Sequence, residues 1–191
     1  MTTPIDLRPA AERMANLVRG VPDDALDRPT PCTAYSVGDL LDHIGGFALA
    51  FRGTAIKEPL AAAPPGNAAN LGDDWRTRIP DDLVALGAVW NEDEAWRGMT
   101  AAGGVDLPAE VAGVVALDEL LIHGWDLARA TGQPAGYDGP GLADVHATVQ
   151  QFRTAGIEGL FGPEVRVADD APLLDRILGL AGRDPAWAPP G

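Results

Sequence analysis

The sequence predicts an all-α protein: a four-helix bundle with short irregular connections and one more helix in its C-terminal tail. In several long stretches, apolar residues recur at the 3.6-residue period of an amphipathic helix. No stretch shows the strong alternation of a half-buried strand, and Pro- or Gly-rich segments separate the helical stretches. We expect residues 1–191 to form a single domain, with a core over about 5–160 and a tail over 161–191 packed on it.

Two helices are predicted in the N-terminal part of the chain. Residues 5–19 carry an apolar stripe, and the three prolines that follow within eleven residues forbid a continuous helix. A second helix is expected after Ser36, a typical N-cap residue, with Asp39 three residues later in the capping-box position. Apolar residues from Val37 to Phe51 then keep the helical period. Residues 58–70 are rich in Pro, Ala and Gly and predict a surface loop.

The C-terminal part predicts more helices and one minor β element. A third helical stretch runs from about residue 80 to residue 90, and the Gly-rich connection over 92–107 has room for a short hairpin. A long helix is expected over 108–131, with a proline at its start and a glycine at its end. We expect 140–156 to be the last helix of the bundle and 172–181 to be the tail helix.

Composition excludes several classes of protein. With 46% apolar and 22% charged residues, the chain has the composition of a folded domain. Its net charge of −14 and its lack of a basic cluster predict binding neither to nucleic acid nor to anionic membranes. It has no apolar run long enough to span a membrane and no signal-peptide pattern. One cysteine, Cys32, forms no internal disulfide, so we expect a cytoplasmic protein.

Three ionisable residues lie on one face of the long helix predicted over 108–131. This helix is apolar around most of its circumference, so we expect it to be buried. Glu119, His123 and Asp126 fall within a sector about 60° wide. Glu119 and His123 are four residues apart and can reach one point, and His43 on the second helix can face the same interior. Two nitrogens and one oxygen with an open fourth position are typical of a catalytic zinc site. The sequence therefore predicts a metal site at His43, Glu119 and His123.

Other interpretations of these residues stay open at this stage. A histidine at the border of an apolar face also fits a hydrogen-bonded core residue. A Glu–His pair at this spacing also fits an ordinary ion pair on a helix. Asp126 fits either an acceptor for the second ring nitrogen of His123 or an acid paired with Arg129.

Four further residues are weaker candidates. His146 fits a metal ligand or, more simply, a surface or core histidine. Cys32 precedes a helix N-terminus, which would lower its pKa, but its sequence neighbours supply no base, so we expect a buried structural thiol. Trp90 and Trp125 fit core packing better than the lining of a pocket.

Two motifs and the tail resemble a known family. PTPCTAYSVGDLLDHIGG resembles the opening motif of the mycothiol-dependent maleylpyruvate isomerase-like metal-binding domain, within the DinB-like superfamily. ALDELLIHGWDLARATGQP resembles its second motif, and the RDPAW ending is similar to that of short members. The resemblance covers nearly the whole chain. It implies a DinB-like four-helix bundle that holds a divalent metal, usually zinc or nickel, through His43, Glu119 and His123.

The resemblance also implies thiol chemistry. A low-molecular-weight thiol, mycothiol in this branch, would enter at the open metal position, lose its proton there and attack an electrophilic small molecule. The isomerase itself has a second, C-terminal domain, whereas this sequence stops at Gly191. We therefore favour S-transfer or another thiol-dependent reaction over maleylpyruvate isomerisation as the predicted activity. A non-catalytic bundle that binds a metal or small ligand is the alternative. The sequence does not fix the substrate or the oligomeric state, and a homodimer stays open.

Overall fold

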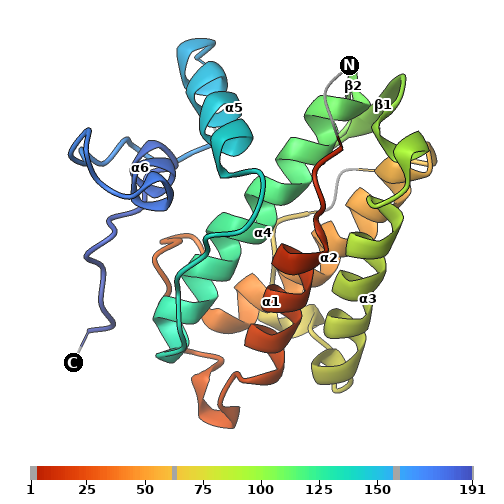
Figure 1. The fold of residues 1–191 in the computed structure, drawn as a ribbon. Helices are drawn as coiled ribbons and strands as arrows, with labels where there is room; N and C mark the ends of the chain where they lie inside the picture. The colour runs from red at the N-terminus through yellow and green to blue at the C-terminus, as the bar shows by residue number, and fades with distance from the viewer. Residues whose placement is uncertain (1–3, 62–63, 157–159, 191) are drawn as a thin grey trace.

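The computed structural model describes residues 4–61, 64–156 and 160–190, so residues 62–63 of the predicted loop lie outside it. Four of its helices lie side by side as a bundle (Figure 1). These are α1 (Arg8–Arg19), α2 (Val37–Ala55), α3 (Trp75–Val89) and α4 (Ala109–Thr131). The predicted mostly helical bundle is confirmed.

The starts of α1 and α2 follow from local hydrogen bonds. Asp6 Oδ1 accepts the N–H of Arg8 at 3.0 Å, and α1 begins at that residue rather than at residue 5. At α2, Ser36 Oγ accepts the N–H of Asp39 at 3.2 Å, while Asp39 Oδ2 accepts the N–H of Ser36 at 3.0 Å. This reciprocal pair satisfies two N–H groups that a helix start leaves without partners. The predicted capping box is therefore present.

The start of α3 differs from the prediction. The helix begins at Trp75, so Pro80 lies inside it rather than at its first turn. Trp75 and Ile79 are both buried against the bundle, and this burial favours the extra turn. Pro80 removes one helical N–H donor, a local cost that the packing of the first turn outweighs.

A short hairpin joins α3 to α4, as predicted. It consists of the antiparallel strands β1 (Met99–Ala102) and β2 (Val105–Pro108). Two glycines form its turn with φ angles of 58° and 83°, values that favour glycine. Thr100 Oγ1 donates to the carbonyl of Thr54 at 2.7 Å, and Thr54 Oγ1 donates to the carbonyl of Ala101 at 2.9 Å. These hydrogen bonds fasten the hairpin to the C-terminal end of α2.

Two helices, α5 (Leu142–Thr154) and α6 (Leu173–Leu180), stand outside the bundle, beside α4 and away from α3 (Figure 1). The prediction that residues 140–156 form the last helix of the bundle is thus wrong. On α5 only Val145 and Val149 are buried, a stripe too narrow for a helix surrounded by three others. The fourth helix of the bundle is α3, which packs against α1 and α2.

A continuous apolar core fills the space between the four bundle helices. Its largest fully buried side chains include Met14, Leu40, Leu41, Ile44, Ile79, Leu83, Leu86, Trp90, Leu117, Leu120 and Leu121. Trp90 Nε1 donates to the carbonyl of Phe51 at 3.0 Å, so the indole is buried without losing its hydrogen bond. The expected core packing of Trp90 is confirmed.

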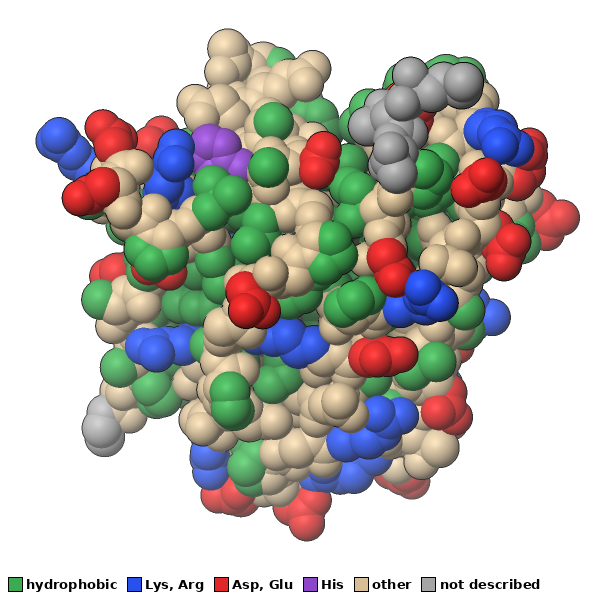
Figure 2. All heavy atoms as spheres, in the orientation of Figure 1, with side chains coloured by type: hydrophobic (Ala, Val, Ile, Leu, Met, Phe, Trp, Pro, Cys, Tyr) green, Lys and Arg blue, Asp and Glu red, His purple; other side chains and the backbone are tan. Residues whose placement is uncertain are grey.

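The face of the molecule shown in Figure 2 carries both charged and apolar side chains. On the face shown in Figure 2, acidic and basic side chains are interspersed. None of the described helices is long and apolar enough to cross a membrane.

Candidate metal centre

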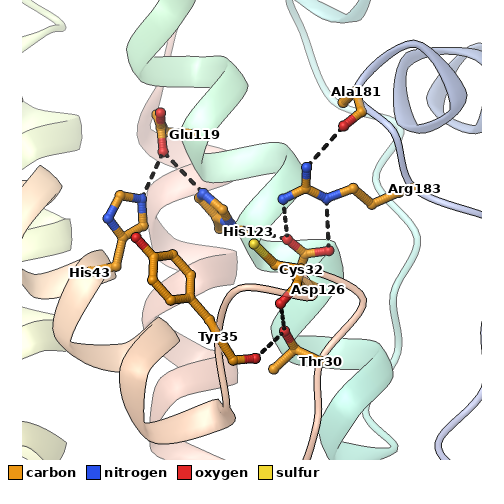
Figure 3. A network of polar contacts seen from close by, with 9 residues as sticks. All are labelled: Thr30, Cys32, Tyr35, His43, Glu119, His123, Asp126, Ala181 and Arg183. Carbon is orange, nitrogen blue, oxygen red and sulfur yellow. Dashed lines mark hydrogen bonds and ion pairs between the residues drawn. The ribbon is translucent and has the colours of Figure 1, made fainter. Parts of the chain in front are cut away.

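Three ionisable side chains meet where α2 and α4 face each other (Figure 3). Glu119 Oε2 lies 3.4 Å from Nε2 of His43 and 3.3 Å from Nε2 of His123. One donor atom from each of the three residues lies within 4.8 Å of the other two. The structure thus brings together the three residues that the sequence analysis proposed as ligands.

Local structure places each of these donors. Glu119 and His123 are one turn apart on α4, and His43 is on the second turn of α2. Gly66 passes directly over His43, because a Cβ at Gly66 would come within 2.8 Å of the His43 Cβ and 2.3 Å of the Asp39 carbonyl oxygen. A side chain at Gly66 would therefore displace the loop that covers this face of α2.

Asp126 orients the ring of His123. Asp126 Oδ2 lies 3.0 Å from Nδ1 of His123. Because the same oxygen of Asp126 accepts a hydrogen bond from Arg183, it acts as an acceptor toward His123, so Nδ1 carries a proton and Nε2 faces Glu119. This contact fixes which ring nitrogen is directed toward the two other donors, as partners of metal-binding histidines commonly do.

Asp126 is fully buried and pairs with Arg183 of the C-terminal tail. Arg183 Nη2 donates to Oδ2 at 3.0 Å and Nε donates to Oδ1 at 3.3 Å. The remaining Nη1 group donates to the carbonyl of Ala181 at 2.9 Å. Arg129, the alternative partner in the sequence analysis, instead donates to the carbonyl of Trp187. A cation from 57 residues further along the chain thus neutralises the carboxylate behind His123.

Burial and pairing shift the pKa values of the two α4 donors in opposite directions. For Glu119, burial raises the pKa, but the contacts with the imidazoles of His123 and His43 outweigh it and hold that pKa well below its usual range. For His123, burial lowers the pKa, but the contacts with Asp126 and Glu119 outweigh it and raise the pKa to about 10. Without a metal ion, the pair is therefore a carboxylate beside an imidazolium at neutral pH.

The spacing of the donors fits a small divalent ion. Ligands about 2.0–2.1 Å from a tetrahedral zinc ion stand about 3.3 Å apart, and the two observed separations are 3.3 and 3.4 Å. The same separations are long for hydrogen bonds from an imidazole, which favour about 2.9–3.0 Å. One carboxylate oxygen and two imidazole nitrogens are also a donor set that zinc and nickel accept. The residues present thus fit the metal that the resemblance implies.

Asp118 is a buried acid that the sequence analysis did not single out. Its side chain lies beside the centre, and its Oδ1 has no hydrogen-bond partner among the described residues. Burial raises its pKa to about 8, and the neighbouring charge of Glu119 acts in the same direction. Asp118 is therefore mainly uncharged at neutral pH.

Cys32 lies close to the same cluster. Its Sγ and one ligand atom each of His123 and Asp126 lie within 4.8 Å of one another. The side chain is half-buried rather than buried. The sequence neighbours of Cys32 supply no base, but the fold brings His123 beside it, a contact that local sequence does not reveal.

An apolar cavity of about 440 Å³ opens beside His43 and Glu119. Its larger lining side chains are Tyr35, Phe47, Phe51, Leu60, Val115 and Leu160. Apart from Thr54 and the two candidate ligands, the other described lining residues are Gly, Ala or Pro. The Tyr35 and His43 ring centroids are 5.3 Å apart, and Figure 3 shows the phenol beside that imidazole. A small organic molecule in this cavity would contact the candidate metal centre.

The remaining candidates lie elsewhere. His146 is on α5, in a shallow hollow with Arg176, and belongs to neither ligand group found among the described residues. Trp125 is buried, with the Arg129 guanidinium 5.8 Å from its ring centroid, and neither Trp125 nor Trp90 is among the residues that line the cavity.

Sequence reasoning also missed the roles of Arg183 and Tyr35. Arg183 belongs to the RDPAW ending, which only the family resemblance had drawn attention to. Tyr35 precedes the N-cap of α2 and shows no periodicity, so only the tertiary structure places its ring over His43.

Two relatives of this chain come from Mycobacterium tuberculosis. Two uncharacterized proteins of Mycobacterium tuberculosis, from strains CDC 1551 and H37Rv, are each 34% identical to this chain over 194 residues. Each alignment covers 91% of this chain and 93% of the relative.

A solved structure shares the fold. The crystal structure of the mycothiol-dependent maleylpyruvate isomerase matches with a TM-score of 0.69 and 16% sequence identity. The match covers 94% of this chain and 87% of the isomerase chain.

A family model also matches the sequence. The model of the mycothiol maleylpyruvate isomerase N-terminal domain matches residues 7–128, a segment that contains His43, Glu119 and His123. This segment includes all four helices of the bundle except the last turn of α4. The chain belongs to the mycothiol maleylpyruvate isomerase N-terminal domain family.

Proposed function

We propose that the protein is a metal- and thiol-dependent enzyme of the S-transferase or isomerase type. It would use mycothiol to attack an electrophilic small molecule. The observation that carries the proposal is the spacing of the nitrogens of His43 and His123 around the carboxylate of Glu119, beside an apolar cavity. Membership of the family and the shared fold of the isomerase support it.

His43, Glu119 and His123 would hold a divalent ion, with zinc or nickel the ions that best suit two imidazoles and a carboxylate. Such an ion lowers the pKa of a thiol that binds it, so that a nucleophilic thiolate exists at neutral pH.

The residues of this chain would prepare the site. Asp126 keeps the Nδ1 proton of His123 in place and directs Nε2 toward the other donors. Arg183 pairs with Asp126 and supplies a cation beside this buried carboxyl group. The aromatic and aliphatic wall of the cavity would hold the electrophile and keep water away from it.

The proposed reaction is conjugate addition. A bond forms between the thiolate sulfur and one alkene carbon of a conjugated carbonyl compound, and the π electrons move to the carbon next to the carbonyl. In S-transfer that carbon takes a proton and a thioether results. In isomerisation the new single bond rotates, and the electron pair returns to expel the thiolate and restore the alkene.

Chain length does not decide between these two outcomes. The structural match spans 87% of the isomerase chain, so the expected lack of a second domain gives no ground for setting isomerisation aside. The single cysteine and the thiol chemistry both suit the reducing cytoplasm, which we infer as the location.

Metal analysis and a thiol assay test the proposal together. Protein purified without an affinity tag should contain about one divalent ion per chain, measured by inductively coupled plasma mass spectrometry. It should then consume a conjugated alkene faster in the presence of mycothiol than the thiol does alone. His43→Ala and Glu119→Ala should lose metal and activity.

His146→Ala is the matched control, because His146 is outside the ligand group, and it should keep both metal and activity. Full metal content in His43→Ala and Glu119→Ala would contradict the ligand assignment. A bound metal without thiol-dependent turnover of any electrophile would instead indicate a non-catalytic binding protein.

A further inference from the structure

Besides the candidate ligand His43, the described wall of the cavity beside the candidate metal centre has no basic side chain. Its described lining residues include neither Lys nor Arg, and Glu119 brings a negative charge to one end. The undescribed residues 1–3, 62–63, 157–159 and 191 are not Lys or Arg either. All 14 Lys and Arg residues of the chain are therefore among the described residues, and none of them lines this cavity.

Arg52 at the C-terminal end of α2 and Lys57 just after it both form contacts outside the cavity. Arg52 Nη1 lies 2.7 Å from Asp82 Oδ1 on α3. Lys57 Nζ donates to the carbonyl of Ala95 at 2.7 Å. Arg183, on the other side of His123, is held by Asp126. None of these cations is free to pair with an anion in the cavity.

A bound metal does not give the site a net positive charge once a thiolate is also bound. A divalent ion, the Glu119 carboxylate and one thiolate together carry no net charge. A ligand carboxylate that entered the apolar wall would lose its hydration and gain no paired cation, which is costly. The net charge of −14 for the whole chain also opposes the approach of an anion.

The cavity does offer one neutral hydrogen-bond donor. The Tyr35 hydroxyl accepts the N–H of Gly66 at 3.3 Å, so its own proton is available to a ligand. The Thr54 hydroxyl is within hydrogen-bond distance of two backbone carbonyl oxygens, those of Ala50 and Ala101. Tyr35 thus suits a single uncharged acceptor, such as the carbonyl oxygen of an ester or ketone.

We propose that this cavity selects an uncharged, largely apolar electrophile, such as a conjugated ester or ketone, and disfavours dicarboxylates, including maleylpyruvate. The catalytic part of this inference rests on the proposed function, whereas the binding preference does not.

Diethyl maleate and maleate form a matched pair of probes, because both have the same cis alkene and only maleate carries two negative charges. The readout is the rate with the metal-loaded enzyme and mycothiol, divided by the uncatalysed rate of each compound. We expect this enhancement to be about tenfold or more larger for the diester. An equal or larger enhancement for maleate would overturn the proposal.

A binding measurement separates this inference from the proposed function. N-phenyl-1-naphthylamine is an uncharged dye whose fluorescence rises in apolar surroundings. It should bind to the metal-free protein, in which the Glu119 carboxylate and the His123 imidazolium together carry no net charge, and diethyl maleate should displace it at far lower concentration than maleate. If neither compound is consumed but this displacement is seen, the charge preference stands and the thiol function fails. Failure of the dye to bind, or equal displacement by the two compounds, would overturn the assignment of the cavity.

Val115→Arg tests the charge argument directly. Val115 is half-buried, lines the cavity and lies one turn before Glu119 on α4. The new guanidinium should weaken dye binding and shift the preference toward maleate by about tenfold or more. Val111→Arg is the control, because Val111 is on the same helix but lines a different hollow. If Val115→Arg does not fold, Ala50→Arg places the cation on the α2 side of the same cavity.

Tyr35→Phe tests the neutral donor. It should lower kcat/KM for diethyl maleate by about tenfold, since the lost hydrogen bond goes to a carbonyl oxygen. Binding of the dye, which has no carbonyl, should change little. Unchanged kcat/KM in Tyr35→Phe would contradict the role of the hydroxyl.

Discussion

Asp126 connects the candidate metal centre to the rest of the molecule. One of its oxygens contacts both Nδ1 of His123 and Nη2 of Arg183, each at 3.0 Å. A buried carboxylate without these two partners would be strongly destabilising. The residue therefore has two roles: it orients the ring of the candidate ligand His123 and anchors the tail.

Asp126→Asn should weaken divalent metal binding by about 10–100-fold. The amide oxygen can still accept the Nδ1 proton, but the negative charge that makes the imidazole a better ligand is lost. The affinity can be measured by competition with a chromophoric chelator, after circular dichroism has confirmed folding. Asp144→Asn, an exposed position on α5, is the control and should bind normally. Unchanged affinity in Asp126→Asn would show that Asp126 does not tune His123.

The metal-free protein should lose stability as the pH rises from about 6.5 to 10. The pKa of His123 rises from its ordinary 6.5 to about 10 on folding, so the imidazolium stabilises the fold fully below 6.5. That contribution is lost as the pH passes about 10, and it amounts to a few kcal/mol in the free energy of unfolding. Urea denaturation at pH 6, 8 and 10 with a chelator present measures it.

His123→Gln is the comparison for this pH series. Asp118, whose pKa is also raised, titrates in both proteins, so the difference between them reports His123 together with its charge coupling to Asp118 and Glu119. Parallel pH dependences in the two proteins would argue against the raised pKa.

At the scale of elements, the start of α2 determines where His43 lies. The capping box at Ser36 and Asp39 fixes the first turn, and His43 follows on the second turn. Asp39 Oδ1 also accepts the N–H of Ala68 at 2.8 Å, which ties the following loop to the same turn. A single side chain thus positions both the ligand-bearing helix and the loop that covers it.

Ser36→Ala should lower the free energy of unfolding by about 1 kcal/mol. The variant leaves the N–H of Asp39 without its cap and removes the hydroxyl that Asp39 Oδ2 contacts at 2.6 Å. Urea denaturation of the metal-free protein measures the loss. Ser36→Thr keeps a capping hydroxyl and should retain most of the stability. Equal loss in both variants would mean that the effect comes from packing and not from the cap.

At the scale of the whole molecule, the C-terminal tail is joined to the bundle through charge as well as apolar contact. Arg183 is only 9% exposed, and it reaches Asp126 on α4 from beyond α6. Helices α5 and α6 pack together beside α4, so this ion pair lies where the tail meets the bundle (Figures 1 and 3).

Arg183→Met should destabilise the protein by about 3–5 kcal/mol, because it leaves the Asp126 carboxylate buried without its cation. Metal affinity should fall as well, since the carboxylate that orients His123 loses its partner. Thermal denaturation and a metal titration measure the two effects. Arg166→Met removes an exposed arginine of the same tail and should change stability by less than about 0.5 kcal/mol. A similar small change in Arg183→Met would show that the pair does not hold the tail.

Local signals were enough to predict most of the elements. The capping box, the proline and glycine positions and the 3.6-residue period of apolar residues all lie within one helix, so they appear directly in the sequence. The start of α3 was misplaced, because only the burial of Trp75 and Ile79 in the folded protein reveals the earlier turn. The placement of α5 was also wrong, since the number of helices does not say which of them share a core.

By itself, the sequence determined the all-α class and the pairing of Glu119 with His123, because both depend on helical spacing along one segment. The position of His43 on the second helix also made it a candidate third donor, and the motif likeness implied the same three residues. Only the tertiary structure decided that Arg183 rather than Arg129 neutralises Asp126, and that an uncharged cavity adjoins the donors. Those features depend on side chains from distant segments. Tertiary packing decides which of these side chains meet, and the order of residues along the chain does not reveal it.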